Sequence, residues 1–213
     1  MKKNGPSLFE QIYQMNLGPS PTAPKVDCQS CSMTAQDKTH ADRWRQFKCC
    51  TFQPFVPNFT LGALLEDQAF SAPFTIGGGE HFWQPLGLVP GWQFRQRHQR
   101  TPDHHRGADL VCDFYDLSSR ACRIWEYRPS ECRGFFCPSP SPEWTAHTQT
   151  AFDLEVRLAQ QALLEAGFNL SDIHRQVDAL NEPADLKSWD PSTLVDLYQA
   201  SWKFVRANAQ SKT

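Results

Sequence analysis

The most informative stretch of the chain reads CRIWEYRPSECRGFFC and runs from Cys122 to Cys137, with Cys132 between them. Four arginines accompany these thiols: Arg120, Arg123, Arg128 and Arg133. Cationic neighbours lower the pKa of a thiol and stabilise a negatively charged, thiolate-rich metal centre. Some of these arginines could instead form an ordinary salt-bridged surface with Glu126 and Glu131. We expect the stretch to form part of a metal site.

The remaining cysteines lie upstream in three places. Cys112 stands alone, Cys49 and Cys50 are adjacent, and Cys28 and Cys31 form a CxxC pair. CxxC spacing lets two thiolates reach one metal from a tight turn. A thioredoxin-like motif shares that spacing, but Pro-rich sequence precedes this one where a strand would be needed. Adjacent cysteines point in different directions, so Cys49 and Cys50 could serve two metal atoms, or one could simply pack.

Eight cysteines in a 213-residue chain without an apolar leader favour metal ligation over disulfides. The expected metal ligands are all eight: Cys28, Cys31, Cys49, Cys50, Cys112, Cys122, Cys132 and Cys137. Thiolates suit both zinc and iron–sulfur clusters. Eight sulfurs exceed one closed tetrahedral zinc site, so we expect an iron–sulfur cluster or iron, with zinc as the alternative. A disulfide-stapled secreted domain ranks last.

Two histidines, His104 and His105, lie shortly before Cys112. One of them could bind the metal together with cysteines, in a site with mixed nitrogen and sulfur ligands. We expect instead that both face solvent in a loop, and that a His105→Ala variant keeps its metal.

The cysteine pattern resembles that of the YkgJ-type cysteine-cluster family, described as a zinc- or iron-chelating domain. The resemblance covers about residues 25–140 and is most specific from Cys122 to Phe136. Besides the eight cysteines, the matching positions are Ile124, Trp125, Arg128, Pro129, Arg133 and Phe135. The family often has its CxxC close to the CC pair, whereas here Ser32 to Lys48 separate them. A branch of the family contains flagellin lysine N-methylases, which implies that methyl transfer to a protein lysine is conceivable.

The predicted fold is mainly α with irregular loops, a cysteine-rich metal-binding core and C-terminal helices. Three segments are expected: an N-terminal helix and Pro/Ser-rich arm over 1–24, the cysteine-cluster domain over 25–142, and a helical segment over 143–213 that packs on the core. Within the second segment we expect loops and short helices rather than a regular sheet. The Gly77–Gly79 run lacks the ending of a phosphate-binding loop and is expected to be a plain turn.

Helices are predicted at four places. The first spans Ser7 to Met15, and the second spans 58–67 with Asn58 as its cap. Apolar residues at helical spacing predict a third, from about residue 151 to 163, with Gly167 at its C-terminus. A fourth follows Asp190, the expected N-cap before Pro191, and its apolar stripe reaches Val205.

Composition limits the partners. The formal net charge of −2 gives no reason to expect nucleic acid or an anionic membrane. No run of 18 apolar residues is present, so we expect a cytoplasmic protein with no membrane span. Two functions stay open: an iron–sulfur or iron protein with redox or group-transfer activity, and a non-enzymatic zinc-binding structural or adaptor module. The sequence does not reveal the protein or small molecule that would be its partner.

Overall fold

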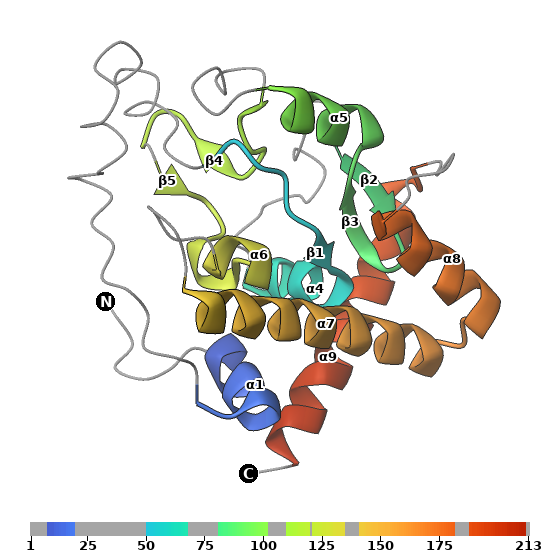
Figure 1. Ribbon diagram of the computed structural model, residues 1–213. Helices are drawn as coiled ribbons and strands as arrows, with labels where there is room; N and C mark the ends of the chain where they lie inside the picture. The colour runs from blue at the N-terminus through green and yellow to red at the C-terminus, as the bar shows by residue number, and fades with distance from the viewer. Residues whose placement is uncertain are drawn as a thin grey trace.

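The computed structural model describes residues 8–19, 50–67, 81–101, 110–119, 121–134, 141–181 and 188–211. The described chain is mainly helical, as predicted, with two small sheets (Figure 1). Its α-helices are α1 (Leu8–Leu17), α4 (Asn58–Glu66), α5 (Trp92–Arg100), α6 (Ser130–Arg133), α7 (Pro142–Glu165), α8 (Leu170–Asn181) and α9 (Val195–Gln210). Among these helices, none is both long enough and apolar enough to cross a membrane.

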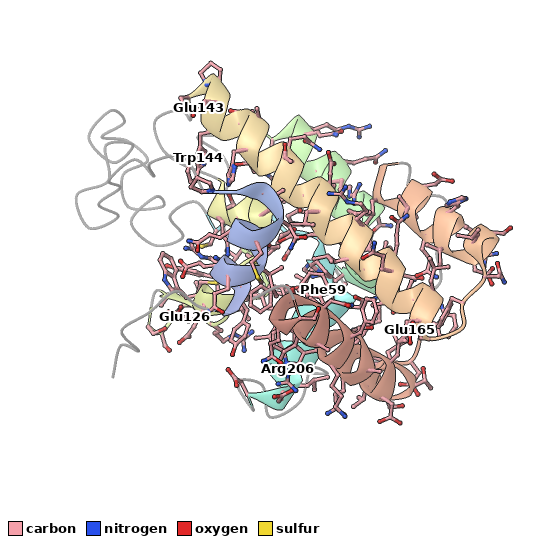
Figure 2. The ribbon with its side chains drawn as sticks, turned by 90° about the horizontal axis from the view of Figure 1, so that it is seen from below. Phe59, Glu126, Glu143, Trp144, Glu165 and Arg206 are labelled. Atoms are coloured by element: carbon pink, nitrogen blue, oxygen red, sulfur yellow. The ribbon has the colours of Figure 1, made fainter. Side chains whose placement is uncertain are left out.

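Helix α7 is the longest described element and runs across the molecule from Glu143 and Trp144 to Glu165 (Figure 2). Ser141 caps it by accepting a hydrogen bond from the backbone N–H of Trp144, and Pro142 occupies the first turn, where no donor is required. At the other end Gly167 has a φ of +87°, which glycine adopts without strain. The predicted helix and its terminal glycine are confirmed.

Helices α4 and α9 pack directly against each other. A Cβ atom at Gly62 would lie 1.9 Å from the carbonyl oxygen of Tyr198, so the contact requires glycine on α4. The predicted helix over 58–67 is confirmed, but Asn58 is its first residue rather than its cap, which is Pro57. The buried Asn58 amide donates to the carbonyl oxygens of Pro85 and Ala159 instead, and thereby ties α4 to a turn and to α7.

The middle of the chain contains strands that the sequence analysis did not expect. Strands β1 (Val56–Pro57), β2 (His81–Gln84) and β3 (Gly87–Pro90) form an antiparallel sheet in the order β1-β3-β2. Nearly every residue of these strands is buried, so the alternation that identifies a half-exposed strand is missing. A second, two-stranded sheet pairs β4 (Tyr115–Asp116) with β5 (Ala121–Cys122).

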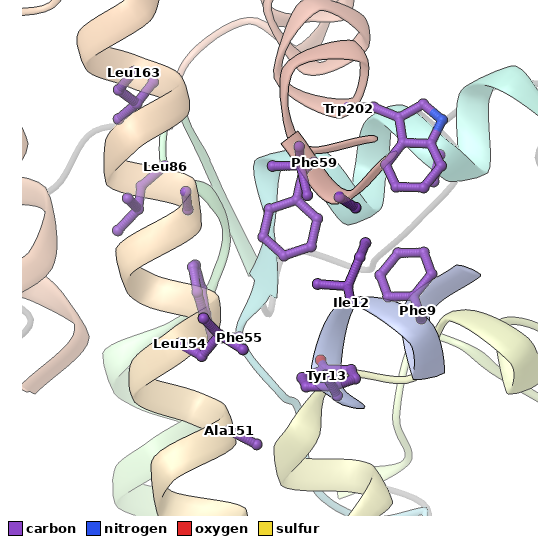
Figure 3. Packing of buried hydrophobic residues seen from close by; sticks show 14 of the residues in the cluster. Phe9, Ile12, Tyr13, Phe55, Phe59, Leu86, Ala151, Leu154, Leu163 and Trp202 are labelled. Carbon is purple, nitrogen blue, oxygen red and sulfur yellow. The ribbon is translucent and has the colours of Figure 1, made fainter. Parts of the chain in front are cut away.

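The larger hydrophobic cluster brings α1 and α9, the first and last described helices, together around α4 (Figure 3). Phe9 of α1 stacks on Trp202 of α9 at 5.6 Å between ring centroids, and Phe59 of α4 lies 6.1 Å from Phe9. The helix predicted over 7–15 is therefore confirmed as α1, which is packed into the core. The second cluster holds Trp83, Phe114, Tyr115, Ile124, Tyr198 and Cys112, with Cys50 and Cys122 against it.

Near the C-terminus, the Asp190 carboxylate accepts from the backbone N–H of Ser192, as expected of a cap. It begins a 3-10 turn, η5 (Pro191–Leu194), which leads into α9. Helices α5 and α8 were not predicted. The expected turn at Gly77–Gly79 and most of the Pro/Ser-rich arm lie outside the described residues.

Candidate metal centre

Four of the eight expected ligands, Cys50, Cys112, Cys122 and Cys132, belong to described segments. The other four, Cys28, Cys31, Cys49 and Cys137, lie outside the described residues, as do His104, His105 and Arg120. No disulfide joins any pair of the described cysteines.

Cys50 and Cys112 are joined through the backbone. The N–H of Cys112 donates to the carbonyl oxygen of Cys50 at 2.8 Å, across a large separation in sequence. The side chain of the buried Gln53 holds the same segment on both sides of Cys112. It donates to the carbonyl oxygen of Val111 and accepts from the N–H of Asp113, each at 3.1 Å. The position of Cys112 is thus set by hydrogen bonds to the segment that follows Cys50.

The β4–β5 hairpin brings Cys122 back toward Cys112. Cys122 pairs with Tyr115, and the next N–H along, that of Arg123, donates to the carbonyl oxygen of Phe114 at 2.8 Å. The turn between the strands is held by Asp116, whose carboxylate accepts from two serines, Ser118 and Ser119. Those hydrogen bonds hold the pKa of Asp116 well below its usual range.

The segment from Trp125 to Gly134 carries Cys132 on the short helix α6, after the 3-10 turn η4 (Trp125–Tyr127). The guanidinium of Arg128 lies 3.4 Å from the centroid of the Trp125 ring, a cation–π contact. Arg133 donates to the carbonyl oxygens of Arg128 at 2.6 Å and of Glu126 at 2.7 Å. The arginines of this segment therefore brace its backbone.

Helix α6 is anchored to α7 by Glu155, which is only 1% exposed. One carboxylate oxygen accepts from the backbone N–H of Ser130 at 2.8 Å and from the hydroxyl of Tyr13 on α1, and the other accepts from the Ser130 hydroxyl at 2.7 Å. Burial raises the pKa of Glu155 to about 7, although its three donors oppose the rise. A single carboxylate thus connects α1, α6 and α7.

Two further contacts hold α6 in place. The Glu131 carboxylate, next to Cys132 in the chain, accepts from the N–H of Phe55 at 2.9 Å. At the end of the helix, the indole N–H of Trp144, labelled in Figure 2, donates to the carbonyl oxygen of Gly134 at 3.1 Å. Cys132 is therefore fixed relative to the segment after Cys50 as well as to α7.

Three thiols, those of Cys112, Cys122 and Cys132, are close enough to affect one another's ionisation. Burial, with a smaller contribution from Cys122, raises the pKa of Cys112 to about 12. Burial also raises the pKa of Cys132, with added contributions from Cys112 and Cys122. The arginine-rich surround was expected to lower these values. Arg123 lowers the pKa of Cys112 and Arg128 lowers that of Cys132, but burial outweighs both, so these two thiols are protonated without a metal.

A histidine that the sequence analysis did not single out lies against the same segment. His81, at the start of β2, places its Nδ1 atom 2.8 Å from the Asp113 carboxylate, and its ring meets the edge of Phe114. The His81 side chain is 2% exposed, and its Nε2 atom has no hydrogen-bond partner among the described residues. Its only sequence signal is a lone histidine, which is too weak to predict a site.

The described residues do not by themselves complete a metal site. Within the described segments, no three His, Cys, Asp or Glu side chains are arranged to hold a metal ion.

No family model matches the chain, and neither the curated proteins nor the solved structures contain a significant match to it. The resemblance to the YkgJ-type family stays a prediction.

Proposed function

We propose that the protein binds a metal centre through its cysteines, as an iron–sulfur cluster or as iron. The observation that supports this best is the grouping of Cys112, Cys122 and Cys132. These residues come from three different local structures, yet each lies close enough to influence the ionisation of another. Redox and methyl-transfer activities stay predictions, as does a cytoplasmic location.

The donor set fits a thiophilic metal. Protonated thiols lose their protons when a metal binds, and metal affinity then depends on pH. Because the three Sγ atoms do not converge in the described structure, binding would require them to rotate toward one point. The cysteines outside the described residues would supply the remaining ligands. A bound iron–sulfur cluster or iron would add electron-transfer or Lewis-acid chemistry at this position.

The surrounding hydrogen bonds support such a site in a specific way. Gln53 holds the backbone around Cys112, and Glu155 holds the helix that carries Cys132. Residues that orient metal ligands without touching the metal commonly determine affinity. The two thiols would then be held at fixed backbone positions, with only their side-chain rotation left to adjust.

Zinc is a second candidate, favoured by one observation. The buried imidazole of His81 lies with its Nδ1 atom 2.8 Å from the Asp113 carboxylate, and its Nε2 atom has no hydrogen-bond partner among the described residues. Nitrogen together with thiolate ligands is typical of closed tetrahedral zinc sites. In that case the protein would be a zinc-binding structural or adaptor module.

Anaerobic purification, followed by metal analysis, an absorption spectrum and an acid-labile sulfide assay, separates the two. A brown protein with iron and sulfide supports the cluster, and a colourless protein with stoichiometric zinc supports the module. We expect Cys122→Ser and Cys132→Ser each to lose metal, whereas His105→Ala keeps it. Full metal content in both cysteine variants would show that the ligand assignment is wrong.

A further inference from the structure

A cavity of about 490 Å³ opens between helices α1, α7 and α9. Its described lining residues all belong to these three helices, and none of them is a cysteine. Pockets that hold small organic molecules typically have volumes of about 300–1,000 Å³. The cavity is therefore large enough for a small ligand, and the proposed metal centre makes no use of it.

The floor of the cavity is apolar. On α7 the side chains of Leu154 and Leu158 are four residues apart, and on α9 those of Val205 and Ala209 have the same spacing, so each pair lies on one face of its helix. Ile12 of α1 completes this floor, and Ile12 and Leu154 are both labelled in Figure 3. All five side chains belong to the larger hydrophobic cluster or pack against it. Core packing therefore shapes the floor without a ligand.

The mouth of the cavity is polar and positively charged. Its exposed side chains are those of Asn16, Arg157, Gln161 and Asn208. Arg157 has no hydrogen bond or ion pair with any of the described residues. The described lining residues include no aspartate or glutamate, so this guanidinium is the one formal charge among them. The mouth thus offers an unpaired cation beside an apolar floor.

This combination indicates a ligand with an anionic head and an apolar body. A guanidinium presents parallel N–H donors that match the two oxygens of a carboxylate. The side-chain amides of Gln161 and Asn208 can donate further hydrogen bonds at the same mouth. We propose that the cavity binds a small monocarboxylate with an apolar chain, its carboxylate at Arg157 and its chain against Leu154 and Val205. The inference does not depend on metal binding by the cysteines.

Calorimetric titration of the full-length protein with decanoate, below the concentration at which decanoate forms micelles, tests the ligand class. We expect one saturable site per chain. Decanol has the same apolar chain but no charge, and it should bind about 5-fold more weakly, near the upper limit for an exposed ion pair. The absence of saturable decanoate binding would overturn the proposal, and equal affinities for decanoate and decanol would overturn the role of the carboxylate.

Substitutions at the mouth test the location of the site. Arg157→Gln removes the charge from an exposed position and should weaken decanoate binding about 5-fold. The matched control, Arg175→Gln, removes the same charge from α8, where the arginine side chain is 73% exposed, and should leave the affinity unchanged. Asn208→Trp places a bulky ring at the mouth and should abolish binding. Wild-type affinity in both mouth variants, or an equal loss in Arg157→Gln and Arg175→Gln, would show that decanoate does not bind in this cavity. If Asn208→Trp does not fold, the comparison of the two arginine variants decides.

Discussion

Glu155 offers a stability test of how the Cys132 segment is held. Two effects compete at this carboxylate. Burial favours its protonated form, while hydrogen bonds from Tyr13 and Ser130 favour its ionised form. Burial is the larger effect, and the pKa rises from 4.5 to about 7. The substitution Glu155→Gln removes the titration but retains an oxygen acceptor and the shape of the side chain.

The sign and size of the effect follow from proton linkage. Between pH 4.5 and 7 the folded protein holds a proton at Glu155 that the unfolded chain has released. The stabilisation by this proton is complete below pH 4.5 and is lost as the pH rises through about 7. Each pH unit in that window costs about 1.4 kcal/mol, so the whole change is about 3 kcal/mol.

The measurement is the free energy of unfolding by urea, for wild type and Glu155→Gln, from pH 4.5 to 8. Other groups titrate in both proteins, so the difference between them isolates Glu155. We expect the wild type to lose about 3 kcal/mol relative to the variant over this range. A flat difference would show that the donors cancel the effect of burial, and a wild type that gains stability as the pH rises would show that they outweigh it; either result would refute the raised pKa.

Two further predictions concern close contacts at glycine. At Gly62 an added methyl would lie 1.9 Å from a backbone oxygen of α9, so Gly62→Ala should lower the free energy of unfolding by about 3 kcal/mol. The control is Gly18→Ala, whose Cβ meets nothing within 4 Å. It should lower the free energy of unfolding by about 1 kcal/mol, because the φ of Gly18 is positive. Equal losses in urea unfolding would contradict the packing of α4 on α9. Gly134→Ala, with its Cβ 2.1 Å from the Thr148 hydroxyl, should cost about 2 kcal/mol, and a second substitution, Thr148→Ala, should restore part of it, because the Cβ at position 148 still lies 2.6 Å from the added methyl. An additive double variant would refute that contact.

The sequence predicted a helix well where an apolar stripe at helical spacing is followed or preceded by a residue that typically caps a helix. The stripe of α7 and the positive φ required at Gly167 are both readable in the sequence. Helix α8 carried the same kind of stripe, with Ile173 and Leu180 buried, and could have been predicted. Helix α5 could not, because Phe94 is the one fully buried side chain among its described residues and no stripe forms.

The candidate site was predictable only in part. The cysteine spacing indicated that Cys112, Cys122 and Cys132 belong together. In the described structure these three thiols are close enough to affect one another's ionisation. The residues that hold them were not predictable. Glu155 follows Leu154 on an amphipathic helix, where a glutamate is normally expected on the exposed face. His81 begins a buried strand far from the cysteines in sequence, and the contact with Asp113 depends on tertiary structure.

The most direct test of the central claim is the metal and thiol content of the anaerobically purified full-length protein. We expect stoichiometric iron with acid-labile sulfide, or stoichiometric zinc, together with loss of that metal in Cys112→Ser, Cys122→Ser and Cys132→Ser variants that still fold. A folded wild-type protein that contains eight reactive thiols and no metal, and that takes up neither zinc nor iron when these are supplied, would contradict the account.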